Sequence, residues 1–273
     1  MRKKTVIHIH PDYEFLRGNI EAIPHKFLQE GKLIRDKRNH LREVQYQGID
    51  LCVKSFKKPQ PFNQIMYSFF RMGKAQRSYK YALRLKEYKI NTPSPIAYIE
   101  QYSRWGLLTH SYYICEYEAH FMRIGDINKM AFSQPKKEAI IGQFIAEVED
   151  KLHHNGIVNK DFNGSNVLVS EKNGQYRFSF VDINRIRFKQ KLTHRDELMQ
   201  LNMISDDPEV LMMIAQAYAQ TKQLKSRDTT YELFTSKYLK KRIHRQQKAV
   251  KNMVKHLIHP WLWLAQKKTQ QMA

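Results

Sequence analysis

The pattern of apolar and polar positions is most informative between residues 153 and 187. Two apolar-rich runs, residues 167–169 and 176–181, flank the dipeptide Asn173-Gly174. That dipeptide is the strongest two-residue turn signal in the chain, because both central positions of such a turn favour positive φ. The pattern therefore predicts a β-hairpin whose open ends lie side by side, with Asn166 at one end and Asp182 at the other.

Strand-like patterns dominate the N-terminal third of the chain. A short strand is predicted at residues 5–9, followed by a helix that starts at Pro11-Asp12 and runs to about residue 22. Alternating or apolar runs bounded by turn residues predict a three-stranded meander and one further strand. These four strands cover residues 32–35, 41–46, 49–56 and 111–117.

Helical spacing of apolar residues appears between these strands and throughout the second half of the chain. A helix predicted at residues 74–88 ends before Asn91-Thr92-Pro93, since the residue before a proline avoids helical geometry. A long helix at about residues 136–154 buries an apolar face and stops at Asn155-Gly156. Further helices are predicted at residues 195–205, 208–221 and 230–239. The arrangement is that of an α+β protein.

Composition sets the class of protein. A chain of 273 residues with 42% apolar residues can bury a sizeable core in one large or two modest domains. Cys52 and Cys115 both lie in apolar runs, so we interpret them as small buried hydrophobes, and a reducing cytoplasm suits them. Residues 1–15 are basic without a following apolar core, and no apolar run reaches 18 residues. We therefore expect neither a signal peptide nor a transmembrane helix.

A formal charge of +21 restricts the choice of partners. Nucleic acid, an anionic membrane surface and a phosphorylated substrate all carry the complementary charge. The sequence has no zinc-finger pattern, RNP motif or clear helix-turn-helix, so no nucleic acid partner is expected.

Three candidate chemical groups surround the predicted hairpin. Asp161 and Asn166 are spaced D-x-x-x-x-N, and Asp182 follows the second strand. Phosphoryl transfer uses one carboxylate to orient the attacking hydroxyl, and a second carboxylate with an amide oxygen to hold Mg²⁺ on the phosphates. The spacing therefore predicts a kinase-like site.

The "KDF…N" loop and the "VDINR" segment resemble the lipopolysaccharide kinases of the Kdo/WaaP type, over roughly residues 24–190. That family is a protein-kinase-like group that phosphorylates inner-core sugars. The resemblance implies a bilobal protein-kinase-like fold, with an N lobe near residues 1–118 and a C lobe near 119–273. It also implies ATP and Mg²⁺ as cofactors and a lipopolysaccharide or lipid A–core sugar as the acceptor, with Kdo as the first candidate.

The resemblance assigns roles to individual residues. Asp161 is the expected catalytic residue, and Asn166 and Asp182 are the expected metal ligands. Lys54, in the third strand of the meander, is expected to contact the nucleotide phosphates. The backbone near Glu116 and Glu118 is expected to contact adenine.

The sequence departs from the kinase pattern at several positions. The glycine-rich loop is absent, and basic residues in its place either meet phosphates or form a solvated turn. These are Arg35, Lys37, Arg38 and Arg42. The helix at 74–88 has Glu87 as its one acid, which leaves the partner of Lys54 open. Asn159 replaces the usual His, and Ile183-Asn184 replaces the usual Phe-Gly. No Ala-Pro-Glu signal follows, which argues against a protein substrate.

The C-terminal segment, residues 237–268, combines basic residues with apolar residues at helical spacing, including Trp261. Such a helix suits the headgroup layer of an anionic membrane, with a bend at Pro260. The alternative is a helix packed on the second lobe with a solvated basic face. The first interpretation predicts a cytoplasmic protein, peripheral at the inner face of the cytoplasmic membrane.

Two other functions remain open at this stage. One is a kinase for a different small molecule or for a protein, although a basic chain suits cationic aminoglycosides poorly. The other is a pseudokinase that acts as a binding module at the membrane surface. ATP binding without turnover would separate the pseudokinase from the enzyme, and the sequence leaves the oligomeric state unknown.

Overall fold

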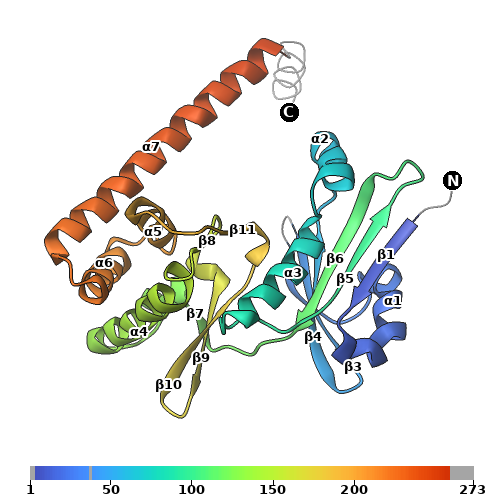
Figure 1. Ribbon diagram of the computed structural model, residues 1–273, viewed down its shortest axis with the longest axis horizontal. Coiled ribbons are helices and arrows are strands. Elements are labelled where there is room, and N and C mark those ends of the chain that lie inside the picture. The colour runs from blue at the N-terminus through green and yellow to red at the C-terminus, as the bar shows by residue number, and fades with distance from the viewer. Residues whose placement is uncertain (1–3, 37–38, 259–273) are drawn as a thin grey trace, which may run out of the picture.

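The computed structural model describes residues 4–36 and 39–258. A six-stranded antiparallel sheet forms the first lobe, in the order β1-β5-β6-β4-β3-β2 (Figure 1). Its strands are β1 (Lys4–Ile9), β2 (Lys32–Asp36), β3 (His40–Tyr46), β4 (Ile49–Phe56), β5 (Pro95–Tyr102) and β6 (Leu108–Glu116). The predicted meander is confirmed as β2, β3 and β4, and its register places Leu41 and Tyr113 on either side of Lys54.

Helices cover both faces of this sheet. The 3₁₀ helix η1 (Pro11–Leu16) and α1 (Arg17–Lys26) pack on one face, through Leu16 and Ile20. On the other face lies α3 (Lys74–Glu87), whose Tyr79 packs beside Phe56. Because side chains alternate along a strand, Lys54 lies on the same face as Phe56, toward α3.

A helical segment that the hydrophobic pattern did not predict precedes α3. It consists of α2 (Pro61–Ile65) and the π-helix η2 (Met66–Phe70). Gln64 Nε2 donates to the carbonyl of Leu108 at 2.8 Å, and the Leu108 N–H donates to Ser68 Oγ at 2.8 Å. These bonds fasten the segment to the start of β6, at the end of the sheet where α2 lies in Figure 1.

The second lobe is mainly helical. The predicted hairpin is confirmed, with Asn173 and Gly174 at φ 53° and 74° and with Val167 opposite Phe180. Phe144 and Phe162 pack around this hairpin in the core. The strands are β7 (Met122–Arg123), β8 (Ile157–Asn159), β9 (Val167–Lys172), β10 (Gln175–Phe180) and β11 (Ile186–Phe188). The helices are η3 (Ile124–Lys129), α4 (Gln134–Glu147), the π-helix η4 (Val148–His153), η5 (Gly164–Asn166), η6 (Ile183–Arg185), α5 (His194–Leu201), α6 (Pro208–Lys222) and α7 (Ser226–Ile258).

The helix predicted at 230–239 and the start of the predicted tail form one continuous helix, α7. Its first turns pack against α5 and α6, with Leu233 buried, whereas Val250 and Met253 are exposed further along. Pro260 and Trp261 lie outside the described residues. Within the described part of the chain, no helix is both long enough and apolar enough to span a membrane.

Candidate active site

The loop that carries Asp161 is shaped by two asparagines. Asn159 Oδ1 accepts from the Asp161 N–H at 3.0 Å. Asn166 Nδ2 donates to the Asp161 carbonyl at 3.0 Å. The Val181 N–H donates to the Asn166 carbonyl at 2.9 Å, which ties the two open ends of the hairpin together. Asp161, Asn166 and Asp182 therefore converge at the open end of the hairpin, as predicted.

Asp182 is the partner of Lys54 that the sequence left open. Lys54 Nζ lies 2.9 Å from Asp182 Oδ1, and their side chains are 17% and 23% exposed. Asn184 Nδ2 donates to the same oxygen at 2.5 Å. Asp182 has left-handed backbone angles, φ 57° and ψ 46°, which turn the chain sharply after β10. Glu87 is exposed at the end of α3, and Ser78 is the α3 residue that lines the cleft.

The side-chain oxygen atoms of Asp182 and Asn166 suit a hard divalent cation. Lys54 and Asn184 both engage Asp182 Oδ1, which leaves Oδ2 as the carboxylate oxygen available to a cation. Since Asn166 uses its Nδ2 on the backbone, its amide oxygen remains for the same purpose. Carboxylate and amide oxygens are ligands that Mg²⁺ accepts in proteins. The predicted metal pair therefore fits the ion chemically.

A cleft of about 320 Å³ lies between the lobes, and all six predicted site residues line it. They are Lys54, Glu116, Glu118, Asp161, Asn166 and Asp182. Tyr13 Oη donates to Glu116 Oε1 at 2.6 Å, and Ser179 Oγ donates to Glu118 Oε2 at 2.6 Å. Burial and the bond to Glu116 raise the pKa of Tyr13 to about 12. Each of these two carboxylates is thus held by a side chain, and the N–H groups of Glu116 and Tyr117 donate to the carbonyls of Ser94 and Asp50.

Several residues that line the cleft carried no sequence signal. They are Ser78, Thr92, Tyr113, His120, Arg123 and Ser165. Arg35 lines the cleft as well, whereas Arg42 donates to the carbonyls of Glu30 and Gly31, at 3.0 Å each, and braces β3. Lys37 and Arg38 lie outside the described residues. Cys52 and Cys115 are free and lie opposite one another on β4 and β6; Cys115 is buried, as expected, whereas Cys52 is only partly buried.

A second cavity, of about 720 Å³, meets the cleft at Asp161 and Asp182. We call it the basic pocket, because eight Lys and Arg residues line it against these two acids. The eight are Lys57, Lys58, Arg71, Lys74, Arg77, Lys160, Arg185 and Arg187. Arg185 Nη1 lies 3.5 Å from Asp161 Oδ2, so this arginine braces the loop that carries Asp161.

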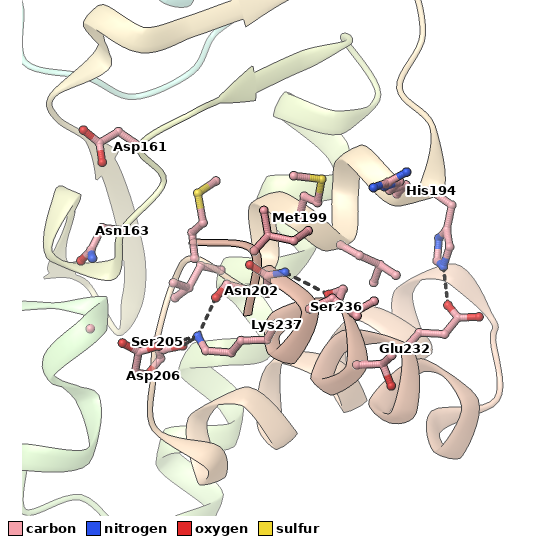
Figure 2. A pocket seen from close by; sticks show the side chains of 18 of the residues that line it. Asp161, Asn163, His194, Met199, Asn202, Ser205, Asp206, Glu232, Ser236 and Lys237 are labelled. Carbon is pink, nitrogen blue, oxygen red and sulfur yellow. Dashed lines mark hydrogen bonds and ion pairs between the residues drawn. The ribbon is translucent and has the colours of Figure 1, made fainter. Parts of the chain in front are cut away.

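A third cavity, of about 1270 Å³, runs from Asp161 along α5 and α7 (Figure 2). Lys237 Nζ donates to the Asn202 carbonyl at 2.7 Å and pairs with Asp206 at 2.9 Å. Asn202 Nδ2 donates to Ser236 Oγ at 2.9 Å. These contacts hold α7 against the loop after α5, as Figure 2 shows. Asp161 therefore lines all three cavities and stands where they meet.

Comparison with known proteins gives one family. The sequence model of the lipopolysaccharide kinase (Kdo/WaaP) family matches residues 35–230. A solved structure titled "WaaP in complex with acyl carrier protein" superposes with a TM-score of 0.56 at 17% identity, covering 90% of this chain and 99% of that one. This likeness shows a protein-kinase-like fold. A yeast RNA polymerase II CTD kinase complex, CTDK-1, gives a TM-score of 0.40 at 14% identity, covering 70% of this chain and 60% of that one. No curated protein matches significantly.

Proposed function

Because the chain belongs to the lipopolysaccharide kinase (Kdo/WaaP) family, we propose that it transfers the γ-phosphate of ATP to an inner-core sugar hydroxyl, with Kdo as the first candidate acceptor. The family consists of phosphotransferases that act on hydroxyl acceptors, and this chain is an enzyme of that class. The observation that carries the proposal is the position of Asp161, which lines both the inter-lobe cleft and the basic pocket.

Asp161 is the proposed catalytic residue. Its side chain is 45% exposed, so an acceptor hydroxyl can reach it from the basic pocket. The carboxylate orients that hydroxyl toward the phosphate and accepts its proton late in the transfer. Arg185, 3.5 Å away, and the loop bonds made by Asn159 and Asn166 hold the carboxylate in place. Positioning of this kind supplies much of the rate in phosphoryl transfer.

The nucleotide belongs in the inter-lobe cleft. Lys54 is proposed to bind its phosphates, and the backbone at Glu116 and Glu118 its base. Asp182 Oδ2 and the amide oxygen of Asn166 are proposed to hold Mg²⁺, which supplies positive charge that stabilises the transferring phosphoryl group. The fit of this donor set to a hard cation supports the assignment.

The charge of the basic pocket indicates an anionic acceptor. Eight cations around two acids attract carboxylate and phosphate groups, and arginines can bind these groups through paired hydrogen bonds. Kdo, which carries a carboxylate, meets this requirement, as do phosphorylated inner-core sugars. A cationic acceptor such as an aminoglycoside does not. Because lipid A–core acceptors are membrane-anchored, we also propose that the protein acts at the inner face of the cytoplasmic membrane.

The test uses purified protein with Mg²⁺ and ATP. One acceptor is lipid A that carries inner-core sugars, and the matched control is lipid A without those sugars. Mass spectrometry should find one added phosphate on the first acceptor and none on the second. ATP binding without a phosphorylated product on any inner-core acceptor would favour the pseudokinase alternative.

A further inference from the structure

Large apolar side chains are exposed together at the end of the N lobe that lies farthest from the segment joining the two lobes. They come from α2, from η2 and from the turn that joins β5 to β6. The most exposed are Phe62 at 74%, Phe70 at 72% and Trp105 at 69%. We call the group, which also includes Ile65 and Phe69, the aromatic edge. Contiguous exposed apolar surface in a soluble domain marks an interaction site.

The two segments of the aromatic edge form one fixed surface. A side chain placed at Gly106, next to Trp105, would lie 3.8 Å from the Phe69 ring. Ser68 Oγ accepts from the Leu108 N–H and donates to the Gln64 carbonyl, at 2.8 and 2.6 Å. The backbone under the exposed rings is therefore pinned by hydrogen bonds, so their exposure is a property of the folded state.

The positive charge near the aromatic edge indicates which kind of partner it binds. Residues 57–77 contain five Lys and Arg residues and no Asp or Glu, and these five cations line the basic pocket next to the edge. The Arg104 guanidinium lies 4.9 Å from the centre of the Trp105 ring. Aromatic rings combined with cations are typical of surfaces that enter the headgroup layer of a membrane, where anionic lipids attract the cations. A second copy of the chain would bring like charges together, which opposes pairing. We propose that the aromatic edge inserts into the headgroup layer of an anionic bilayer.

The segment from Gln60 to Met72 joins this surface to the basic pocket. Gln60, Asn63 and Tyr67 line the pocket and are spaced three and four residues apart, as on one face of a helix. Phe62, Ile65 and Phe69 have the same spacing, do not line the pocket and are exposed. If the exposed residues contact the membrane, an acceptor lipid in that membrane would therefore present its sugar to the basic pocket. This last step rests on the proposed function, whereas membrane insertion of the edge does not.

Trp105 provides a direct test of insertion. The chain has three tryptophans, so a variant with Trp261→Phe and Trp263→Phe retains Trp105 alone. We expect vesicles of phosphatidylethanolamine and phosphatidylglycerol, brominated in their acyl chains, to quench its fluorescence and shift the emission to the blue. The matched reporter adds Trp105→Phe and Leu28→Trp, which moves the single tryptophan to a position that is 73% exposed after α1. That reporter should not be quenched.

Vesicle sedimentation of the full chain gives the size of the effect. Phe62→Ser and Phe70→Ser together should weaken partitioning, by on the order of tenfold for each ring. The control pair is Phe15→Ser and Leu28→Ser, because both side chains are also exposed. The Phe15 carbonyl accepts a hydrogen bond from Gln47 in the β3–β4 turn, which places Phe15 at the opposite end of the sheet. Partitioning of the control should equal that of the wild type.

Three results would overturn the proposal. They are equal quenching of both reporters, equal partitioning of the two serine variants, and concentration-dependent self-association that only the Phe62 and Phe70 changes abolish. Phosphorylation of a deacylated, water-soluble sugar acceptor separates this proposal from the proposed function. The aromatic-edge variant should retain wild-type turnover on that acceptor. If no acceptor is phosphorylated while Trp105 is still quenched, the kinase assignment fails and the membrane surface stands.

Discussion

Replacing Lys54 with methionine removes the cation that joins the two lobes at the cleft. Lys54 belongs to β4 of the N lobe, and its ammonium lies 2.9 Å from Asp182 of the C lobe. Methionine keeps most of the length of the side chain, so packing against the Phe56 ring, 5.2 Å from Nζ, is largely retained. The change therefore tests the charge more than the shape.

The size of the effect follows from the surroundings of the pair. Both side chains are less than one-quarter exposed, so solvent screens the pair only partly. A hydrogen bond to a charged group contributes about 1.5–3 kcal/mol, which corresponds to roughly 10- to 150-fold in affinity. We expect Lys54→Met to weaken ATP binding by that factor. Leaving Asp182 without its cation should also lower the free energy of unfolding by about 1–3 kcal/mol.

Titration calorimetry with ATP and Mg²⁺ measures the first effect, and thermal unfolding measures the second. Lys57→Met is the matched control, because Lys57 lies three residues further along and lines the basic pocket instead of the cleft. The control should retain wild-type ATP affinity. If Lys54→Met binds ATP within about twofold of the wild type, the assignment of Lys54 to the phosphates is wrong, since the expected loss exceeds that several times over.

The remaining predictions concern the metal, the loop and pH. Asp182→Ala should abolish Mg²⁺-dependent turnover in an ATP-consumption assay with a lipid A–sugar acceptor; turnover within a few-fold of the wild type would contradict the metal assignment. Gly164→Ala should lower the melting temperature and turnover, because its Cβ would lie 2.5 Å from a backbone oxygen after α5, whereas Gly142→Ala meets no atom within 4 Å and should do neither. Hydrogen bonds from Lys189 and from the cap of α5 lower the pKa of Asp196 to about 2, so its stabilising charge is present above about pH 4 and lost toward about pH 2. Denaturant unfolding across that window should show a shallower pH dependence for Asp196→Asn than for the wild type.

The sequence predicted the parts of the fold that local rules decide. Asn173-Gly174 specified the hairpin because the turn needs two positive φ values, and the structure has them. Once that hairpin was placed, the spacing of Asp161, Asn166 and Asp182 predicted their convergence.

What the sequence missed depends on contacts between distant segments. The partner of Lys54 lies 128 positions away on the other lobe, so no local pattern could identify it. The α2–η2 segment is short and exposes its apolar residues, which hides the usual signal of a helix with one buried face. The bonds from Gln64 and Ser68 to Leu108 hold it in place, and these too are tertiary contacts. The basic pocket also draws its cations from both lobes.

The central claim is that Asp161 acts on an acceptor hydroxyl, and Asp161→Asn tests it most directly. The change is nearly isosteric, and the backbone bonds from Asn159 and Asn166 do not involve the altered group. The measurement pairs ATP affinity by calorimetry with phosphorylated sugar by mass spectrometry, for wild type and variant on the same inner-core acceptor. We predict unchanged ATP affinity and roughly 10²- to 10⁴-fold less product. Equal product from the two proteins would show that Asp161 only shapes its loop, and the account of the site would be wrong.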